Sequence, residues 1–440
     1  MQTYFYALAD FITAQTKIDE TTLAYLSAEE SNFVRFNKNA VRQAGSVKQL
    51  TLTLSLIANQ RRAESRISLS GERENDEAHV KAILETLRRD LGDLPEDPYL
   101  LFNQTPQSSE HIGESHLPND AEMLDQVISQ GKGKDLVGLF ASGVIYKGFA
   151  NSLGQRNWHR VDNFNFEWCL YHAADKAVKN GYAGTHWNAT EFAEKMAAST
   201  AQLDILKRPA KALSPGQYRA YLAPAAVNEI VELLSWGSFG VKSQRNKQSP
   251  LMRLEDGSMA LHSSVSLKEN SHDGVAPGFQ ADGFLKAAEV PLIVAGKKAG
   301  ALISPRSARE FNIDNNGANS SEAPESLDMA AGNLSADAIL ETLGTGLLIG
   351  NLHYLNYSDR MACRMTGMTR FATFWVENGE IQAPLNVMRF DDSAYRLLGD
   401  NLLGLTKERD LILDPASYGE RSTGSARLPG ALIRDFALTL

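Results

Sequence analysis

Cysteine is nearly absent from this sequence. Its 440 residues include only Cys169 and Cys363, which is too few for a disulfide framework and suits a reducing compartment. No apolar run reaches the length of about 20 residues that a membrane-spanning helix needs. The N-terminal segment is amphipathic, but it lacks the basic start and the unbroken apolar stretch of a signal peptide. We therefore expect a cytoplasmic protein that has no membrane partner.

A basic surplus is also missing. The chain has 44 lysines and arginines against 53 aspartates and glutamates, which gives a formal net charge of −9. Proteins that bind the phosphate backbone of nucleic acids usually carry a positive surplus, so we do not expect nucleic acid as a partner. Arg35, Lys38 and Arg42 form a small basic patch, which we interpret as a solvated strand face.

The length of the chain exceeds what one core supports, so we expect two domains, or three. The hydrophobic pattern predicts an α+β fold, with an N-terminal α+β domain at 1–210 and a β-rich C-terminal domain at 211–440. One predicted helix has Asn75 or Asp76 as its cap, and another has Asn188. The predicted elements of the first domain are strands at 47–57, 61–69, 135–150 and 155–171, helices at 75–91 and 188–206, and a polar loop at 92–120.

Glycines divide the second half into short strand patterns at 344–350, 371–376 and 385–390. Gly344, Gly346 and Gly350 miss the spacing of a dinucleotide-binding loop, and we expect them to pack tightly in a β core. Residues 312–324, NIDNNGANSSEAP, are polar throughout. Such a segment buries little apolar surface, so we predict a mobile surface loop there.

Residues 213–240 contain a strand pattern that leads directly into a helix. The pattern predicts a short strand at 218–222 and a helix that begins at Pro224, which suits a first helical position. Gly237 follows as the residue that ends the helix. Glu229 and Glu232 lie opposite the apolar stripe, and we interpret them as a solvated polar face rather than as two metal ligands. The stripe consists of Val227, Ile230, Val231 and Leu234.

This segment resembles the TldD/PmbA family, once called modulators of DNA gyrase. Residues 215–227 are similar to the Pro-Gly-x-Tyr strand and the Ala-Pro-x-Ala-Val helix start of the PmbA (TldE) branch. Residues 281–283 and 291–302 echo two later parts of the pattern. The most specific likeness is Thr366-Gly367 followed by the Glu-Asn-Gly-Glu-Ile block at 377–381 and Pro384. The resemblance covers residue 31 to the C-terminus and is thin at 90–120.

The zinc-bearing branch of this family carries His-Glu-x-x-x-His on the equivalent helix and a zinc-binding cysteine near its C-terminus. Aligned from the shared Pro224, the two histidines fall on Glu232 and Gly237, and the glutamate falls on Leu233. No histidine lies between His186 and His262, and residues 371–440 contain no cysteine. The resemblance therefore implies a chain without the zinc site, and we predict no catalytic, cofactor-binding or metal-binding residues in it.

In functional terms, the resemblance implies the metal-free subunit type of a cytoplasmic metallopeptidase complex that degrades or matures peptides. The expected partner is a zinc-bearing TldD-type homologue in a heterodimer, with zinc held by that partner and unstructured peptides as substrates. The isolated chain is expected to form a homodimer. Whether the chain itself is an enzyme stays open. One alternative is a self-sufficient hydrolase with a site around His262, His272 and Asp273, and another is a non-enzymatic regulator that binds a protein such as gyrase.

Other candidate residues have weaker patterns. His111, Glu114 and His116 fall in the polar loop, where no predicted helix or strand holds them, so we expect solvated side chains. The run Gly131-Lys132-Gly133-Lys134 resembles a phosphate loop only superficially, since it lacks the final Ser/Thr and precedes a strand. Cys363 stands beside Arg364, which favours a lowered thiol pKa, but no base can be assigned to it.

Overall fold

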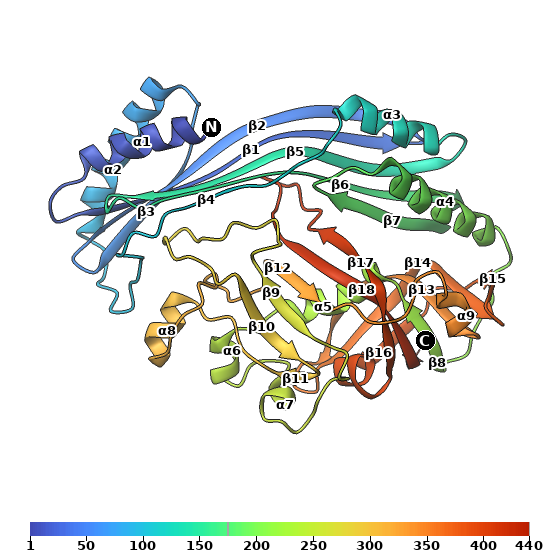
Figure 1. Cartoon of the computed structure of the whole chain (residues 1–440). Helices are drawn as coiled ribbons and strands as arrows, with labels where there is room; N and C mark the ends of the chain where they lie inside the picture. The colour runs from blue at the N-terminus through green and yellow to red at the C-terminus, as the bar shows by residue number, and fades with distance from the viewer. Residues whose placement is uncertain (174–175, 440) are drawn as a thin grey trace.

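The computed structural model describes residues 1–173 and 176–439. In this part of the chain the strands form two sheets, one above the other (Figure 1). The N-terminal sheet contains β1–β7 in the order β3-β2-β1-β5-β6, with β4 and β7 both paired to β6. The C-terminal sheet contains β8–β18 and mixes parallel with antiparallel pairs. The fold class is α+β, as the pattern predicts.

Mostly long antiparallel strands and the helices α1–α4 make up the described part of the first half. Its elements are α1 (Gln2–Gln15), β1 (Thr21–Asn37), β2 (Ala40–Ala58), β3 (Arg61–Ser68), α2 (Arg73–Leu91), β4 (Ser109–Ile112), α3 (Asp120–Gln130), β5 (Asp135–Asn151), β6 (Arg156–Ala173), β7 (Lys176–Gly184) and α4 (Ala189–Leu206).

Shorter elements make up most of the second half. They are β8 (Gly216–Leu222), α5 (Pro224–Ser235), α6 (Val241–Arg245), α7 (Met252–Glu255), β9 (Leu267–Asn270), β10 (Glu289–Val294), β11 (Lys297–Lys298), α8 (Pro305–Phe311), β12 (Ser326–Met329), α9 (Ile339–Leu343), β13 (Gly346–Asp359), β14 (Arg364–Glu377), β15 (Glu380–Pro384), β16 (Arg389–Ser393), the π-helical turn η1 (Arg396–Asp400), β17 (Leu402–Leu413) and β18 (Ser425–Leu438).

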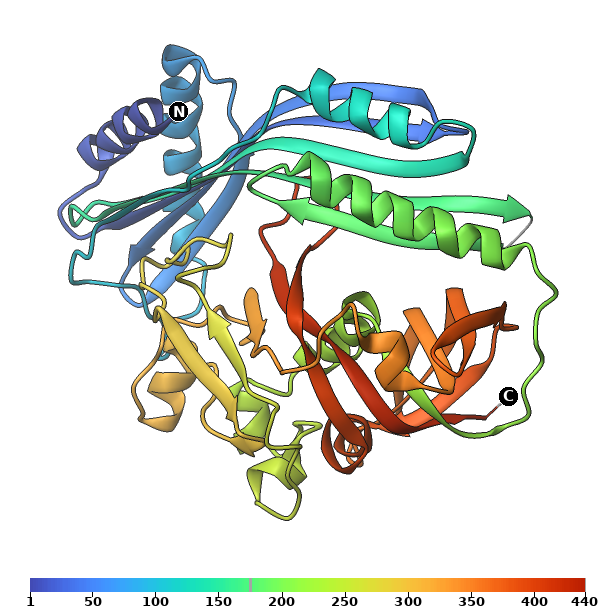
Figure 2. The ribbon, with the colours of Figure 1, turned by 45° about the vertical axis from the view of Figure 1, so that its right-hand side comes forward.

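Strand β6 shows how the N-terminal sheet separates two environments. Successive side chains of a strand point to opposite faces. Phe166 and Trp168 point to the outer face, where the ring of Phe192 on α4 lies 6.0 and 5.9 Å from theirs. His159 and Asn163 point to the inner face, toward the C-terminal sheet. Figure 2 shows the C-terminal sheet below this inner face.

The predicted hairpin of β5 and β6 is confirmed, as is the helix that Asn188 caps by accepting from the backbone of Thr190 and Glu191. The predicted cap of α2 is wrong, because this helix begins at Arg73. Asp76 lies inside its first turn and accepts from the backbone N–H groups of Ser70 and Gly71, so it anchors the entering chain from within the helix. Sequence patterns also missed β7, β17 and β18.

Helix α5 is confirmed at Pro224–Ser235. Its buried stripe packs on the C-terminal sheet at β13 and β18. Gly237 follows the helix with φ +86°, a left-handed conformation that suits glycine. Tight packing is confirmed for Gly346 and Gly350, where a Cβ would lie 2.2 Å from the Arg219 and 3.1 Å from the Ala372 carbonyl oxygen. It is wrong for Gly344, which ends α9 with φ +66° and has open space beside it in the described structure. Residues 385–390 are strand only in part, since β16 starts at Arg389.

The segment 312–324 is not the loose surface loop that its composition predicts. Glu322 is only 3% exposed and accepts from Ser304 N–H at 2.9 Å and from Lys242 N–H at 2.8 Å. Asn316 accepts from Ile303 N–H at 2.8 Å and donates to Ala301 O at 2.7 Å. Its polar side chains therefore satisfy backbone groups of neighbouring segments, which composition cannot reveal.

No helix of the described chain combines the length and apolarity needed to cross a membrane.

Candidate functional site

A cleft of about 300 Å³ lies between the two sheets. One wall comes from β6, β7 and α4, and the other comes from α5, β13 and β17. Polar side chains dominate its lining, which includes Asn165, Glu167, Lys179, Asn180, Tyr182, His186, Glu191, Lys195, Asn228, Glu229, Asn351, Arg409 and Asp410.

Helix α5 turns its polar side toward this cleft because its apolar stripe is buried on the C-terminal sheet. Asn228 and Glu229 line the cleft. Burial raises the pKa of Glu229, and the nearby Glu232 adds to the shift while Lys179 opposes it. Glu229 is half-buried, so its interpretation as a solvated side chain is wrong. Glu232 is exposed as expected, although partial desolvation and Asp414 raise its pKa too.

Ion pairs account for most charges of the cleft. Lys195 on α4 lies 3.2 Å from Asp410 on β17, so this pair connects the two walls. Lys179 lies 3.4 Å from Glu167 within the N-terminal sheet. Neither Glu191 nor Glu229 has an ion pair among the described residues, but Glu191 accepts from the Tyr182 hydroxyl at 3.3 Å, whereas the Glu229 side chain has no such partner. Glu229 is thus the carboxylate of the cleft that a bound ligand would meet with the least competition.

Two strand edges face the cleft from opposite sides. Within the described chain, β7 pairs only with β6. Strand β17 pairs with β18, and its other edge bonds residues 332–334 at 405–407 and is unpaired beyond that point. Residues 179–183 and 409–413 of these edge strands line the cleft. Asn351 on β13 lines it too, and the buried Oδ1 of this side chain has no hydrogen-bond partner in the described structure. Unpaired edges and an unsatisfied acceptor suit a ligand that brings its own main-chain groups.

The residues of the cleft do not fit the zinc site of the zinc-bearing branch. The two histidines of that branch align with Glu232 on α5 and with Gly237 just after it, and neither residue is a histidine. Among the described residues, no group of three or more His, Cys, Asp or Glu side chains is arranged to hold a metal ion. Catalytic zinc requires three protein ligands. Whether the chain binds zinc in solution stays a prediction.

The alternative site around His262, His272 and Asp273 is not assembled. His272 and Asp273 are adjacent and exposed, with 3.9 Å between Nε2 and Oδ1. The imidazole Nδ1 of His262 instead lies 2.8 Å from the Ser264 hydroxyl, and its backbone N–H donates to Leu398 O at 2.8 Å. In the described structure no hydrogen bond or ion pair joins His262 to the other two.

A short strand and an isolated bridge hold the loop histidines, contrary to expectation, although His111, Glu114 and His116 are exposed as expected. His111 lies on β4, and its ring stacks on that of the buried His159 on β6, with 5.0 Å between centroids. His116 forms an isolated β-bridge with His186, and their rings are 4.6 Å apart. The sequence reading failed here because β4 is short and pairs with a strand nearly fifty residues later.

The other weak candidates have structural roles. Burial raises the pKa of the Cys363 thiol to about 12, so the expected lowering by Arg364 is wrong. The run 131–134 ends α3 and leads into β5, as expected for a turn that is not a phosphate loop. Arg35, Lys38 and Arg42 are exposed on the hairpin of β1 and β2, which confirms a solvated strand face.

Comparison with known proteins agrees with this architecture. The family model described as PmbA/TldA metallopeptidase C-terminal domain matches residues 215–439, which is half of the chain. The chain belongs to the PmbA/TldD family. No curated protein matches the sequence.

Solved structures of similar fold cover nearly the whole PmbA/TldD chain. One is a protein from Thermotoga maritima MSB8 named for a proposed role as a modulator of a DNA gyrase, with a TM-score of 0.78, 14% identity and coverage of 99% of this chain and 100% of that one. Another is TldE from Thermococcus kodakarensis, with a TM-score of 0.76, 13% identity and coverage of 99% and 100%. A third, a proposed modulator of DNA gyrase from Bacteroides thetaiotaomicron VPI-5482, has a TM-score of 0.72, 13% identity and coverage of 99% and 98%.

Sequence reasoning missed most of the cleft. The alternation on β6 was a usable signal, because Asn163, Asn165 and Glu167 interleave with aromatic residues and thus mark a polar face that another layer covers. The residues that β7 and β17 contribute to the cleft could not be found in this way, because neither strand was predicted from the sequence.

Proposed function

We propose that this chain is the metal-free subunit type of a metallopeptidase complex in the cytoplasm. A zinc-bearing homologue of the same family would pair with it and supply the chemistry, while this chain completes the cavity that holds the peptide. The observation that carries the proposal is helix α5. It offers Asn228 and Glu229 to the cleft between the sheets, and it has Glu232 and Gly237 at the two positions where the resemblance places the histidines of the zinc-bearing branch.

The cleft is suited to an extended peptide. The edges of β7 and β17 offer free backbone groups, to which a peptide can add as a strand, so that main-chain hydrogen bonds supply affinity without a strict sequence requirement. Asn351 Oδ1 is a buried acceptor in need of a donor, which a peptide N–H provides. The half-buried Glu229 would favour a peptide with a positive charge near this point.

Reconstitution tests this function. Alone, the chain should cleave no unstructured peptide, and a zinc-motif homologue should gain activity when the chain is added, because positioning of the peptide contributes several kcal/mol to such reactions. Asn228→Trp fills the cleft and should lower the activity of the mixture by about tenfold or more, since a blocked ligand loses its positioning. Gln130→Trp, on the exposed end of α3, is the matched control and should leave it unchanged.

Metal content gives an independent test. The purified chain should carry no stoichiometric zinc after gel filtration in dilute chelator, because α5 has no histidine and residues 371–440 have no cysteine. Near-equimolar zinc, or chelator-sensitive cleavage by the isolated chain, would contradict the proposal and favour a self-sufficient enzyme. Recovery of a protein such as gyrase, in place of a zinc-motif homologue, would favour the regulator.

A further inference from the structure

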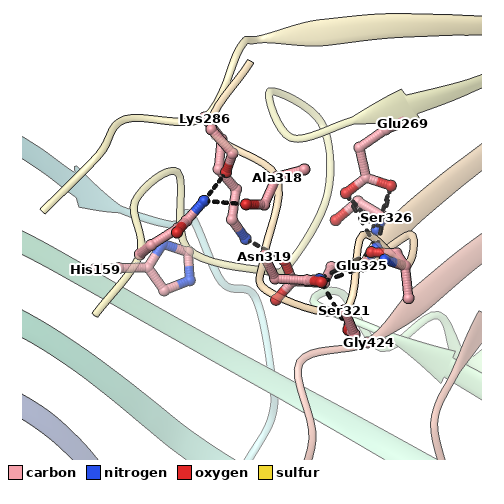
Figure 3. A network of polar contacts seen from close by, with 12 residues as sticks. His159, Glu269, Lys286, Ala318, Asn319, Ser321, Glu325, Ser326 and Gly424 are labelled. Carbon is pink, nitrogen blue, oxygen red and sulfur yellow. Dashed lines mark hydrogen bonds and ion pairs between the residues drawn. The ribbon is translucent and has the colours of Figure 1, made fainter. Parts of the chain in front are cut away.

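One loop of the C-terminal sheet reaches across to the N-terminal sheet. It comprises residues 414–424 between β17 and β18, and we call it the strap (Figures 1 and 2). Its two ends are closed, since Asp414 N–H donates to Gly424 O at 3.0 Å. Ser425 N–H donates to Glu325 O at 3.0 Å, which fixes the strap to the polar network of Figure 3. In that network Glu325 also pairs with Lys286 at 2.7 Å.

Arg421 seats the strap in the inner face of the N-terminal sheet. It is only 6% exposed. One terminal nitrogen donates to the side-chain and backbone oxygens of Asn163 on β6, the latter at 3.1 Å. The other donates to Gly143 O on β5 at 3.3 Å and to the Ser31 hydroxyl on β1 at 3.4 Å. The guanidinium therefore joins three strands of the opposite sheet.

Neighbouring residues of the strap add charge contacts to the same face. The Glu420 carboxylate accepts from the Ser27 hydroxyl and lies 3.8 Å from Lys147 Nζ and 3.7 Å from Arg66. Gln49 donates through its side chain to Gly419 O. These contacts extend the seat of the strap from β6 across to β2 and β3.

The position of Arg421 along β6 separates two hollows. His159 lines a pocket of about 220 Å³ against residues 271–288. Val161 follows and packs on Val275 and Leu413. Asn163 holds Arg421, and the next inner-face residues, Asn165 and Glu167, line the cleft. The docked strap and the Val161 contact thus both lie between the second pocket and the cleft along one continuous strand.

Docking of Arg421 is a balance between opposing terms. Its acceptors are neutral oxygens, and no carboxylate of the described chain lies within ion-pair distance, although Glu29 and Asp120 act on it from farther away. Burial of a charge without an ion partner carries a large desolvation cost, which the hydrogen bonds offset. Gly419 has φ +85° and, with Gly424, gives the strap backbone freedom. Such a contact is easier to release than apolar packing.

We propose that the strap is a releasable latch. With Arg421 seated, it holds the two sheets together and divides the space between them. With Arg421 withdrawn, the cleft extends along β6 past Asn163 to the contact of Val161 with Val275, beyond which the second pocket lies, so that the cleft holds a longer extended ligand. The inference goes beyond the proposed function, because the latch controls access whatever the groove binds.

Cleavage by a glutamate-specific protease at the bond after Glu420 measures release directly in the full chain. Arg421→Ala should raise this rate by about tenfold over the wild-type chain, because cleavage reports the population of the undocked strap. Arg434→Ala is the matched control, since Arg434 is an exposed arginine on β18 and its rate should match the wild type. A rise of less than about threefold for Arg421→Ala overturns the latch.

Arg421→Lys keeps the positive charge but loses the planar guanidinium. It is a milder variant, which keeps the test valid if Arg421→Ala does not fold. It should give a rate between those of wild type and Arg421→Ala, and a rate equal to wild type would also overturn the latch. Cleavage after the buried Glu269 reports global unfolding and should stay unchanged in the lysine variant.

Peptide binding is measured separately. Faster strap cleavage without peptide binding leaves the latch intact and counts against the proposed function alone.

Discussion

The outer face of the N-terminal sheet is packed with aromatic rings, whereas its inner face meets the C-terminal half through polar and charged side chains and two small apolar clusters. On the outer face Phe166, Trp168 and Phe192 are each 1% exposed or less. On the inner face Asn163 and Arg421 are nearly as buried, but a hydrogen bond joins them in place of apolar packing. Apolar packing is non-directional and insensitive to pH. Buried polar contacts depend on geometry and protonation, which suits a surface that has to open.

The largest effect should come from a cavity in the outer face. Phe192→Ala removes a ring that contacts four aromatic neighbours, and it should lower the free energy of unfolding by about 3–5 kcal/mol. Denaturant titration measures this, and the loss should be the same at every pH where the chain is folded. Ile128→Ala, at an exposed position of α3, is the control and should change stability by less than about 0.5 kcal/mol. A loss of that small size for Phe192→Ala would remove the distinction between the two faces.

Glu269, on β9, should make stability fall as the pH rises. Burial raises its pKa to about 7. The backbone N–H groups of Ser326 and Glu325 donate hydrogen bonds to its carboxylate and oppose the shift (Figure 3). The folded state therefore holds the proton more tightly than the unfolded state, whose pKa is near 4.5. Its contribution is present at low pH and is lost as the pH rises through about 7.

Glu269→Gln should remove this dependence. The difference in unfolding free energy between variant and wild type should grow in favour of the variant from acid to neutral pH, by at most about 3 kcal/mol. Denaturant titrations at a series of pH values measure it. Parallel curves for the two proteins would show that the carboxyl titrates normally in the folded chain.

His159 should make stability fall as the pH falls, which is opposite to the effect of Glu269. Burial lowers the pKa of His159 to about 4, and His111 adds to the effect, while its Nε2 lies 3.1 Å from Val275 O in the loop between β9 and β10. The unfolded state, with a pKa near 6.5, binds the proton more readily, so stability is lost as the pH falls from 6.5 toward 4. His159→Gln should reduce this acid loss by at most about 3 kcal/mol. The same titrations test it, and an unchanged acid limb would contradict it.

The smallest effect should come from Glu232 on α5. Its side chain is exposed, so Glu232→Ala should leave stability within about 0.5 kcal/mol and the activity of a reconstituted complex within a few-fold, as at other exposed sites. Glu229→Ala is the substitution to compare with it. The Glu229 carboxylate lines the cleft, so its removal should alter peptide affinity more than Glu232→Ala does. Equal effects of the two substitutions would show that the cleft does not contact the peptide through α5.

Local sequence determined the elements whose apolar pattern and caps agree. The helix at Pro224 was predicted to within a residue, because proline, a period of 3.6 and a final glycine all point to the same bounds. The hairpin of β5 and β6 was predicted for the same reason, since two alternating patterns flank a short turn. The absence of histidine from α5, which excludes the zinc motif there, is likewise a property of the sequence alone.

Tertiary structure decided where the cleft lies and which side chains it holds. Asp410 meets Lys195 from 215 residues away, and Arg421 meets Asn163 from 258 residues away. Neither pair leaves a trace in local periodicity. Composition also misled at 312–324, where polar side chains are buried because backbone groups of other segments need them. Periodicity reports which side of an element is buried, but only the packed chain fixes what buries it.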